Sequence, residues 1–151
     1  MTFTNPTDCP YYLLSRATLQ VTSALKKEFS AADVDAVKPA YLGVLLTLWR
    51  EDGLKVIELS RKAGLEPSTM TGLLDRMERD GLAYRSADPK DRRAQRIYLT
   101  EAGRNVEKPV QEVLEQVLSK VFRGISEKEL SQSMNLLRRV LANAQEGSKN
   151  E

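Results

Sequence analysis

Hydroxyl and cationic side chains gather in two neighbouring segments near the middle of the chain. The first begins at Pro67 and presents short polar residues, and the second is a basic tract that ends at Arg96. The side chains and backbone positions suited to contact a polyanion are Ser68, Thr69, Thr71, Gly72, Arg76, Lys90, Arg92, Arg93 and Arg96. Short hydroxyls reach phosphates or base edges, and the negative potential of a minor groove attracts arginine. The chemistry that this pattern indicates is recognition of double-stranded DNA.

The segment 67–80 has the spacing of an amphipathic helix. Its apolar residues Met70, Leu73, Leu74 and Met77 follow the i, i+3, i+4, i+7 pattern, which leaves the polar residues on the outer face. Proline suits the first position of a helix, and Gly81 follows its end. A solvated helix face is the alternative interpretation, since Ser, Thr and Arg are ordinary surface residues. Gly72 costs about 1 kcal/mol relative to alanine, which close approach to DNA or packing against another helix would justify.

The segment 85–96 is predicted to form a projecting hairpin, or wing. Weakly alternating residues flank a turn-rich tip at 87–91, and several cations crowd the hairpin. Like charges on so small an element repel one another, so a phosphate-bearing partner explains their presence. A solvated charge run is the alternative.

Two further predicted helices place these segments in a fold. Residues 54–64 read as a short helix with Val56, Ile57, Leu59 and Ala63 inward, and an apolar helix starts near Pro39. Two short helices joined by a tight turn form a helix-turn-helix, and a following hairpin makes it winged. The predicted fold class is therefore mainly α with a small β-hairpin, in which residues 39–103 form a winged helix-turn-helix lobe.

The outer segments, about 10–30 and 104–145, read as helices with apolar stripes. Ser126 and Glu129 form a capping box in front of the last helix. These stripes exceed what the small central lobe is able to cover, so we predict that they form a homodimer, with packing inside one chain as the alternative. A two-fold dimer places its reading helices about 34 Å apart, which matches a palindromic operator. All 151 residues are then a single winged-helix subunit.

Composition narrows the function classes. The net charge is +2, but residues 54–104 hold 11 Lys and Arg against 8 Asp and Glu, whereas the remainder holds 12 against 13. The chain has one cysteine and no histidine, which excludes internal disulfides, common zinc sites and histidine bases. With no nucleophile–base pair or glycine-rich phosphate loop, we expect neither an enzyme nor a cofactor. No apolar run of about 18 residues is present, so we expect a cytoplasmic protein without a membrane partner.

Several stretches resemble one family of regulators. The segments that carry the resemblance are LKVIELS (54–60), PSTMTGLLDRME (67–78), GLAYR (81–85), DPKDRRA (88–94) and YLTEAG (98–103). They look like the MarR (multiple antibiotic resistance regulator) family. The resemblance implies a bacterial transcription factor, usually a repressor, that binds a palindromic operator as a dimer and is released by a small ligand.

The resemblance also implies roles for single residues. It places Ser68, Thr69, Thr71 and Arg76 on the DNA-reading helix. Arg93 is then aimed at the minor groove, with Asp91 as a structural residue of the wing and Asp75 pairing with Arg93. Gly72 departs from the larger polar residue often found at its position, so the base that the helix reads is not fixed by the resemblance.

The sequence offers two sets of candidate residues for sensing a small molecule or an oxidant. Related regulators bind small aromatic or anionic ligands in a cleft, for which the candidates are Tyr11, Tyr12, Arg16, Tyr41 and Trp49, with core or interface packing as the alternative. One branch senses hydroperoxides through a cysteine at the start of the first helix, so Cys9 is a candidate redox residue or a bystander. A winged-helix module that binds protein and not DNA is a further alternative.

Overall fold

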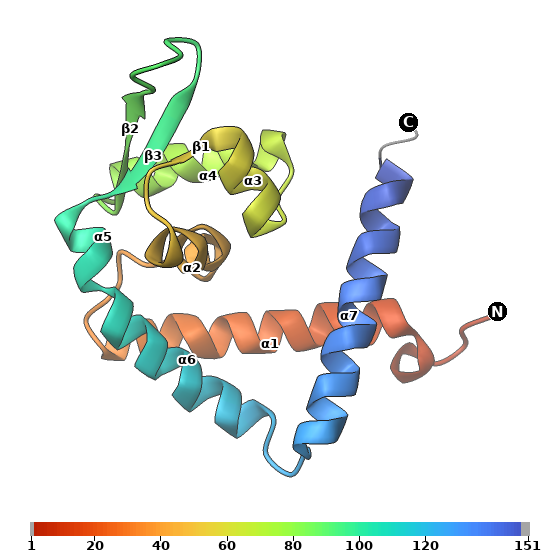
Figure 1. Cartoon of the computed structure of the whole chain (residues 1–151). Coiled ribbons are helices and arrows are strands. Elements are labelled where there is room, and N and C mark those ends of the chain that lie inside the picture. The colour runs from red at the N-terminus through yellow and green to blue at the C-terminus, as the bar shows by residue number, and fades with distance from the viewer. Residues whose placement is uncertain (1, 149–151) are drawn as a thin grey trace. The chain divides into compact units, whose positions relative to one another are not determined.

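The computed structural model describes residues 2–148 and shows a mainly helical chain with one three-stranded antiparallel sheet (Figure 1). The elements are α1 (Pro10–Ala31), α2 (Leu42–Arg50), β1 (Leu54–Lys55), α3 (Val56–Ala63), α4 (Pro67–Arg79), β2 (Ala83–Ala87), β3 (Gln95–Leu99), α5 (Glu101–Asn105), α6 (Glu107–Val121) and α7 (Glu127–Ser148). The chain divides into two compact units, and the boundary lies within α6 between Val117 and Leu118. In the described part of the chain, no helix is long and apolar enough to cross a membrane.

The predicted helix-turn-helix is formed by α3 and α4. Helix α3 ends at Gly64, whose φ of +68° is the left-handed conformation that glycine adopts at little cost. Helix α4 begins with Pro67 and buries Met70, Leu73, Leu74 and Met77, as their spacing predicts. The opposite face of α4 is therefore left to solvent.

The sheet has one strand more than the sequence suggested. Its order is β1-β3-β2, so β3 is the central strand. Ile97 of β3 lies opposite Leu54 of β1 on one side and opposite Arg85 of β2 on the other. Residues 54–55 were expected to begin a helix, but they pair with β3 and the helix starts at Val56. The expectation that Ile57 points inward is also wrong: its side chain is 77% exposed, because the buried face of this short helix runs through Leu59 and Ser60.

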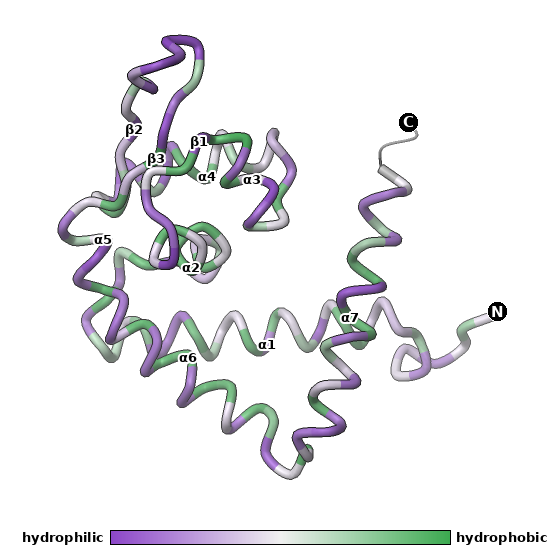
Figure 2. Tube along the Cα trace, viewed as in Figure 1, coloured by the Kyte–Doolittle hydropathy of each residue, from purple (hydrophilic) through white to green (hydrophobic). Residues whose placement is uncertain are grey.

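The core of the first unit joins α1, α2, α4, the sheet and α6. Its largest fully buried side chains include Phe29, Tyr41, Leu45, Leu48 and Met70. Each such side chain contributes about 1.5–3 kcal/mol by leaving water. Green and purple alternate along α1 and α6, which marks them as amphipathic, whereas the tip of the β2–β3 hairpin is purple (Figure 2). This hairpin, residues 83–99, is called the wing below.

The second unit holds the end of α6 and helix α7. The predicted capping box is present: the Glu129 backbone N–H donates to Ser126 Oγ at 3.3 Å, and the Ser126 N–H donates to Glu129 Oε2 at 2.8 Å. This backbone hydrogen bond from Ser126 lowers the pKa of the Glu129 carboxyl. Helix α7 exposes a row of apolar side chains, Met134, Leu136, Leu137, Val140 and Leu141.

Gly103 is a position where the fold leaves no space for a side chain. A Cβ atom there would lie 2.0 Å from the carbonyl oxygen of Leu82, which also accepts the Thr100 N–H. We expect Gly103→Ala to lower the free energy of unfolding by about 3 kcal/mol, because backbone has to move. Gly147→Ala is the control, since nothing lies within 4 Å of that position. Urea denaturation of both variants tests this, and equal midpoints would contradict it.

Candidate nucleic-acid interface

The outer face of α4 presents the predicted reading residues to solvent. Ser68, Thr69, Thr71 and Arg76 are exposed, and Gly72 is half-buried. The residue before the helix, Glu66, makes no side-chain capping bond, so the first N–H groups of α4 are available to an anion. Thr71 Oγ1 donates to the Pro67 carbonyl oxygen at 3.3 Å, within the helix. The structure therefore brings this group together on one accessible surface.

Gly72 is not required by packing within the chain. A Cβ atom placed there meets only the end of the Arg76 side chain, at 3.6 Å. Packing against another helix of the same chain was one of the two explanations for a glycine inside α4, and the described structure does not support it. The remaining explanation is an external surface that approaches the backbone closely.

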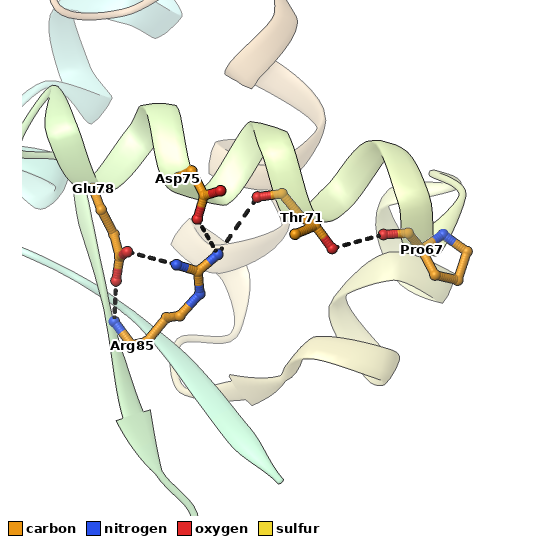
Figure 3. Close-up of polar contacts among 5 residues, drawn as sticks. All are labelled: Pro67, Thr71, Asp75, Glu78 and Arg85. Carbon is orange, nitrogen blue, oxygen red and sulfur yellow. Dashed lines mark hydrogen bonds and ion pairs between the residues drawn. The ribbon is translucent and has the colours of Figure 1, made fainter.

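Arg85 of β2 connects the wing to α4 (Figure 3). Its Nη1 lies 2.7 Å from Glu78 Oε2 and its Nη2 lies 2.8 Å from Asp75 Oδ1. Its backbone N–H also donates to Glu78 Oε1 at 2.8 Å. The expectation that Asp75 pairs with Arg93 is therefore wrong, because strand β2 runs against α4 and places Arg85 between the two carboxylates.

A buried carboxylate organises the turn that connects the two strands of the wing. Asp88 is 2% exposed and accepts hydrogen bonds from the backbone of Lys90 at 2.8 Å and Asp91 at 3.1 Å, and from Arg96 Nε at 2.6 Å. These bonds, led by the one from Lys90, lower the pKa of Asp88 against the opposing effect of burial. Arg96 Nη1 donates in addition to the Gly53 carbonyl oxygen at 2.7 Å, which ties the wing to the loop before β1.

This arrangement corrects the role predicted for Arg96 and adds a structural carboxylate that the sequence analysis did not name. Arg96 was placed among the DNA contacts, but its guanidinium is bound within the protein by Asp88 and Gly53. Asp91 was given the structural role, and it does accept the Arg93 N–H at 3.0 Å, but it is exposed. The buried structural carboxylate is Asp88. Sequence reasoning missed it and Arg85, although Asp88 before Pro89 is a typical turn signal.

Among residues 2–148, the cations at the wing tip have no acidic partner. Lys90, Arg92 and Arg93 are exposed, and within residues 2–148 their side chains take part in no ion pair or hydrogen bond. The internal ion pairs of the wing use Arg85 and Arg96 instead. The tip therefore carries a local positive charge that the protein does not neutralise.

The five candidate cleft residues fall into two groups, of which one is part of the core and the other is exposed. Tyr41 is 1% exposed, and its hydroxyl donates to Asp80 Oδ2 at 2.5 Å; burial and this hydrogen bond raise its pKa. Trp49 packs against the core and donates from Nε1 to the Gly103 carbonyl oxygen at 2.9 Å. Tyr11, Tyr12 and Arg16 are exposed near the N-terminal end of α1. Tyr41 and Trp49 are thus structural residues, as the alternative interpretation held.

Cys9 is the N-cap residue of α1 and is half-buried. Its side chain makes no capping hydrogen bond, and its thiol is free of any disulfide. The position agrees with the one inferred from Pro10. A redox role for it stays a prediction.

Comparison with known proteins assigns the chain to a family. The sequence model of the MarR family matches residues 39–94. The HTH-type transcriptional repressor IacR of Pseudomonas putida is 30% identical over 138 residues, which cover 90% of this chain and 80% of IacR. The chain belongs to the MarR family.

Solved structures agree with this assignment. A MarR family regulator from Silicibacter pomeroyi is 30% identical, with a TM-score of 0.67 and coverage of 92% of both chains. PcaV of Streptomyces coelicolor, at 22% identity, shares the fold with a TM-score of 0.82 over 95% of this chain and 99% of PcaV. The predicted family and the mainly helical winged fold are confirmed. The matching proteins are transcriptional regulators and not enzymes, which also agrees with the prediction.

The buried Asp88 makes the stability of the MarR wing depend on pH in a defined direction. Its pKa is lowered from the ordinary 3.8, so the ionised carboxylate stabilises the folded state above that pH, and the stabilisation is lost as the pH falls through the folded-state pKa. We expect Asp88→Asn to be less stable than wild type at pH 6, with a smaller loss of stability on acidification from about pH 5 downward. Thermal denaturation at a series of pH values measures this. Parallel curves for the two proteins would contradict it.

Proposed function

We propose that the chain is a dimeric transcriptional repressor that binds a palindromic operator with α4 in the major groove and the wing in the minor groove, and that a small ligand releases it. The observation that carries this proposal is the separation of roles among the arginines. Arg85 and Arg96 fix the wing to the rest of the lobe, whereas the side chains of Arg92 and Arg93 at its tip have no partner in the part of the chain that the structure describes. Free cations on a braced hairpin suit a fixed, polyanionic surface such as DNA.

The contact between the wing and α4 supports simultaneous use of both elements. Arg85 contacts Asp75 and Glu78 on α4, so the strand and the reading helix are held at one relative orientation. A duplex presents its two grooves at a fixed spacing, and a protein that reads both gains from elements that are already aligned. Basic charge at the tip also argues against the alternative of a protein-binding module without DNA affinity.

The exposed apolar surfaces support the dimer. Helix α1 exposes Leu13, Leu14 and Leu19, and α7 carries its own exposed apolar row. Apolar surface of this extent on a water-soluble chain is typical of an interface. A two-fold axis relating two copies would present two α4 helices to successive major grooves.

Repression and ligand response rest on the relatives. IacR is described as a transcriptional repressor, and the structure of PcaV contains its natural ligand. The class of ligand that we propose for this chain is a small aromatic or anionic compound. Its binding to the DNA-free state would lower the population of operator-bound protein.

Substitution of Gly72 separates stability from DNA binding. We expect Gly72→Ala to raise the free energy of unfolding by about 1 kcal/mol, because alanine is the better helix former and the site has space for a methyl group. The same methyl group would stand between α4 and the DNA, so we expect about tenfold weaker binding. Urea denaturation and fluorescence anisotropy test the two effects. A stabilised variant with unchanged DNA affinity would show that α4 does not approach DNA closely at this position.

Substitution of Arg93 tests the wing. We expect Arg93→Ala to weaken binding about tenfold and to reduce the slope of log affinity against log salt by about 1, because one cation–DNA contact is lost. The duplex is one selected by the wild-type protein from a random pool, and anisotropy is measured at several salt concentrations. Arg123→Ala, an exposed arginine outside the lobe, is the matched control. Both variants are expected to remain dimers in sedimentation. Equal affinity and equal salt slope in the two variants would contradict the assignment.

A further inference from the structure

An acidic side chain lies in the middle of the outer face of α4. Ser68, Gly72 and Asp75 are spaced i, i+4 and i+7, so they follow one line along the helix, opposite its buried face. The Asp75 side chain is 61% exposed. The phosphates of a duplex repel a carboxylate, so its presence on a surface proposed to face DNA requires a physical reason.

One oxygen of the Asp75 carboxylate is not used by the protein. Oδ1 lies 2.8 Å from Arg85 Nη2, whereas Oδ2 has no partner in the part of the chain that the structure describes. In Figure 3, a dashed contact joins only one of the two oxygens to Arg85. Oδ2 is therefore a free hydrogen-bond acceptor on a side chain whose position Arg85 restrains.

Glu78, about one turn further along α4, is a carboxylate that is fully used in holding Arg85. Its Oε1 accepts the Arg85 backbone N–H at 2.8 Å, and its Oε2 lies 2.7 Å from Arg85 Nη1. Both oxygens have a partner, and the side chain is only 32% exposed. Because Glu78 already braces the arginine, bracing does not account for the exposure and the free oxygen of Asp75.

The residues that precede Asp75 on the same line allow a short side chain to reach a base. Aspartate has a single methylene group, so its carboxylate meets a base edge only where the helix lies deep in the groove. Gly72 has no side chain, and a Cβ atom there would meet only the end of the Arg76 side chain, at 3.6 Å. Ser68 is small and exposed. These two residues leave room for the close approach that Asp75 needs.

The base edges of the major groove differ in how well they suit a group that only accepts hydrogen bonds. Guanine and thymine present acceptors, and adenine places its N7 acceptor next to its N6 amino donor. Cytosine presents its N4 amino donor without an acceptor beside it on the same base, and this edge fits an ionised carboxylate.

We propose that Asp75 is a specificity-determining residue, and that its Oδ2 accepts a hydrogen bond from the N4 amino group of one cytosine in each half-site of the operator. The inference rests on the proposed function, because it requires α4 to lie in the major groove. It assigns Asp75 a contact with DNA in addition to its contact with Arg85.

Substitution by the isosteric amide tests the base preference. Wild type, Asp75→Asn and Glu78→Gln each select duplexes from a random pool, and the selected sites are then varied one base pair at a time. We expect wild type to require a C·G pair at one position of each half-site, with about tenfold weaker binding when that pair is replaced. Asp75→Asn should prefer adenine at this position, because an amide both donates and accepts and so pairs with N6 and N7 of adenine.

Glu78→Gln is the matched control, because it removes a carboxylate that contacts the same arginine. This variant should keep the preference of wild type for cytosine, whatever its overall affinity. A preference for cytosine that persists in Asp75→Asn would overturn the proposal. So would a preference that is lost equally in both variants, since Asp75 would then act only through Arg85.

A modified base tests the hydrogen bond itself. When N4-methylcytosine pairs with guanine, its methyl group replaces the amino hydrogen that faces the major groove. We expect fluorescence anisotropy to show about tenfold weaker binding of wild type to the modified duplex than to the unmodified one, and equal binding of the two duplexes by Asp75→Ala. Equal weakening in both proteins would overturn the hydrogen bond.

The outcomes distinguish this inference from the proposed function. A wild-type protein that selects no duplex from the pool would contradict DNA binding by the chain, and with it the role of Asp75. A wild-type protein that selects a duplex and depends on Arg93, but shares all its base preferences with Asp75→Asn, would contradict the role of Asp75 alone.

Discussion

The geometry of the wing depends on one buried carboxylate. Asp88 closes the turn at its own end of the hairpin through the backbone of Lys90 and Asp91, and it holds Arg96 on the opposite strand. Arg96 then reaches the Gly53 carbonyl oxygen, so the same ion pair ties the hairpin to the loop that precedes α3. One ion pair thus fixes the turn of the wing, the strand opposite Asp88 and the distant loop at Gly53. A buried charge of this kind is costly unless every bond is made, which favours a single wing conformation.

Arg85 extends this rigidity from the wing to the reading helix. Its guanidinium bridges Asp75 and Glu78 on α4, while its backbone remains part of β2. Two ion-pair systems therefore use two of the four arginines of residues 85–96, and the other two are left without acidic partners in the described chain. Because the ion-paired arginines fix the hairpin that also carries the other two, the positions of all four arginines are coupled although the two pairs share no partner.

Periodicity was sufficient to predict the helices, but not the pairing of charges. The spacing of Met70, Leu73, Leu74 and Met77 predicted α4, and the turn residues around Pro89 predicted the wing. Strand β1 was not predictable, because two residues carry no alternation and its pairing with Ile97 is set by tertiary contact. Arg85, Arg93 and Arg96 look equivalent in sequence, and only the strand register shows which of them faces an acidic residue. The burial of Tyr41 has the same origin, since its partner Asp80 is 39 residues away.

The bracing of the wing bears on how such a regulator responds to a ligand. A ligand held between distant helices must shift the spacing of two reading helices, which requires two conformations with different affinities for it. Arg85 ties the wing to α4, and Asp88 with Arg96 ties it to the loop before β1. These contacts favour movement of the lobe as a unit over rearrangement within it, so a ligand would act through the spacing between two lobes.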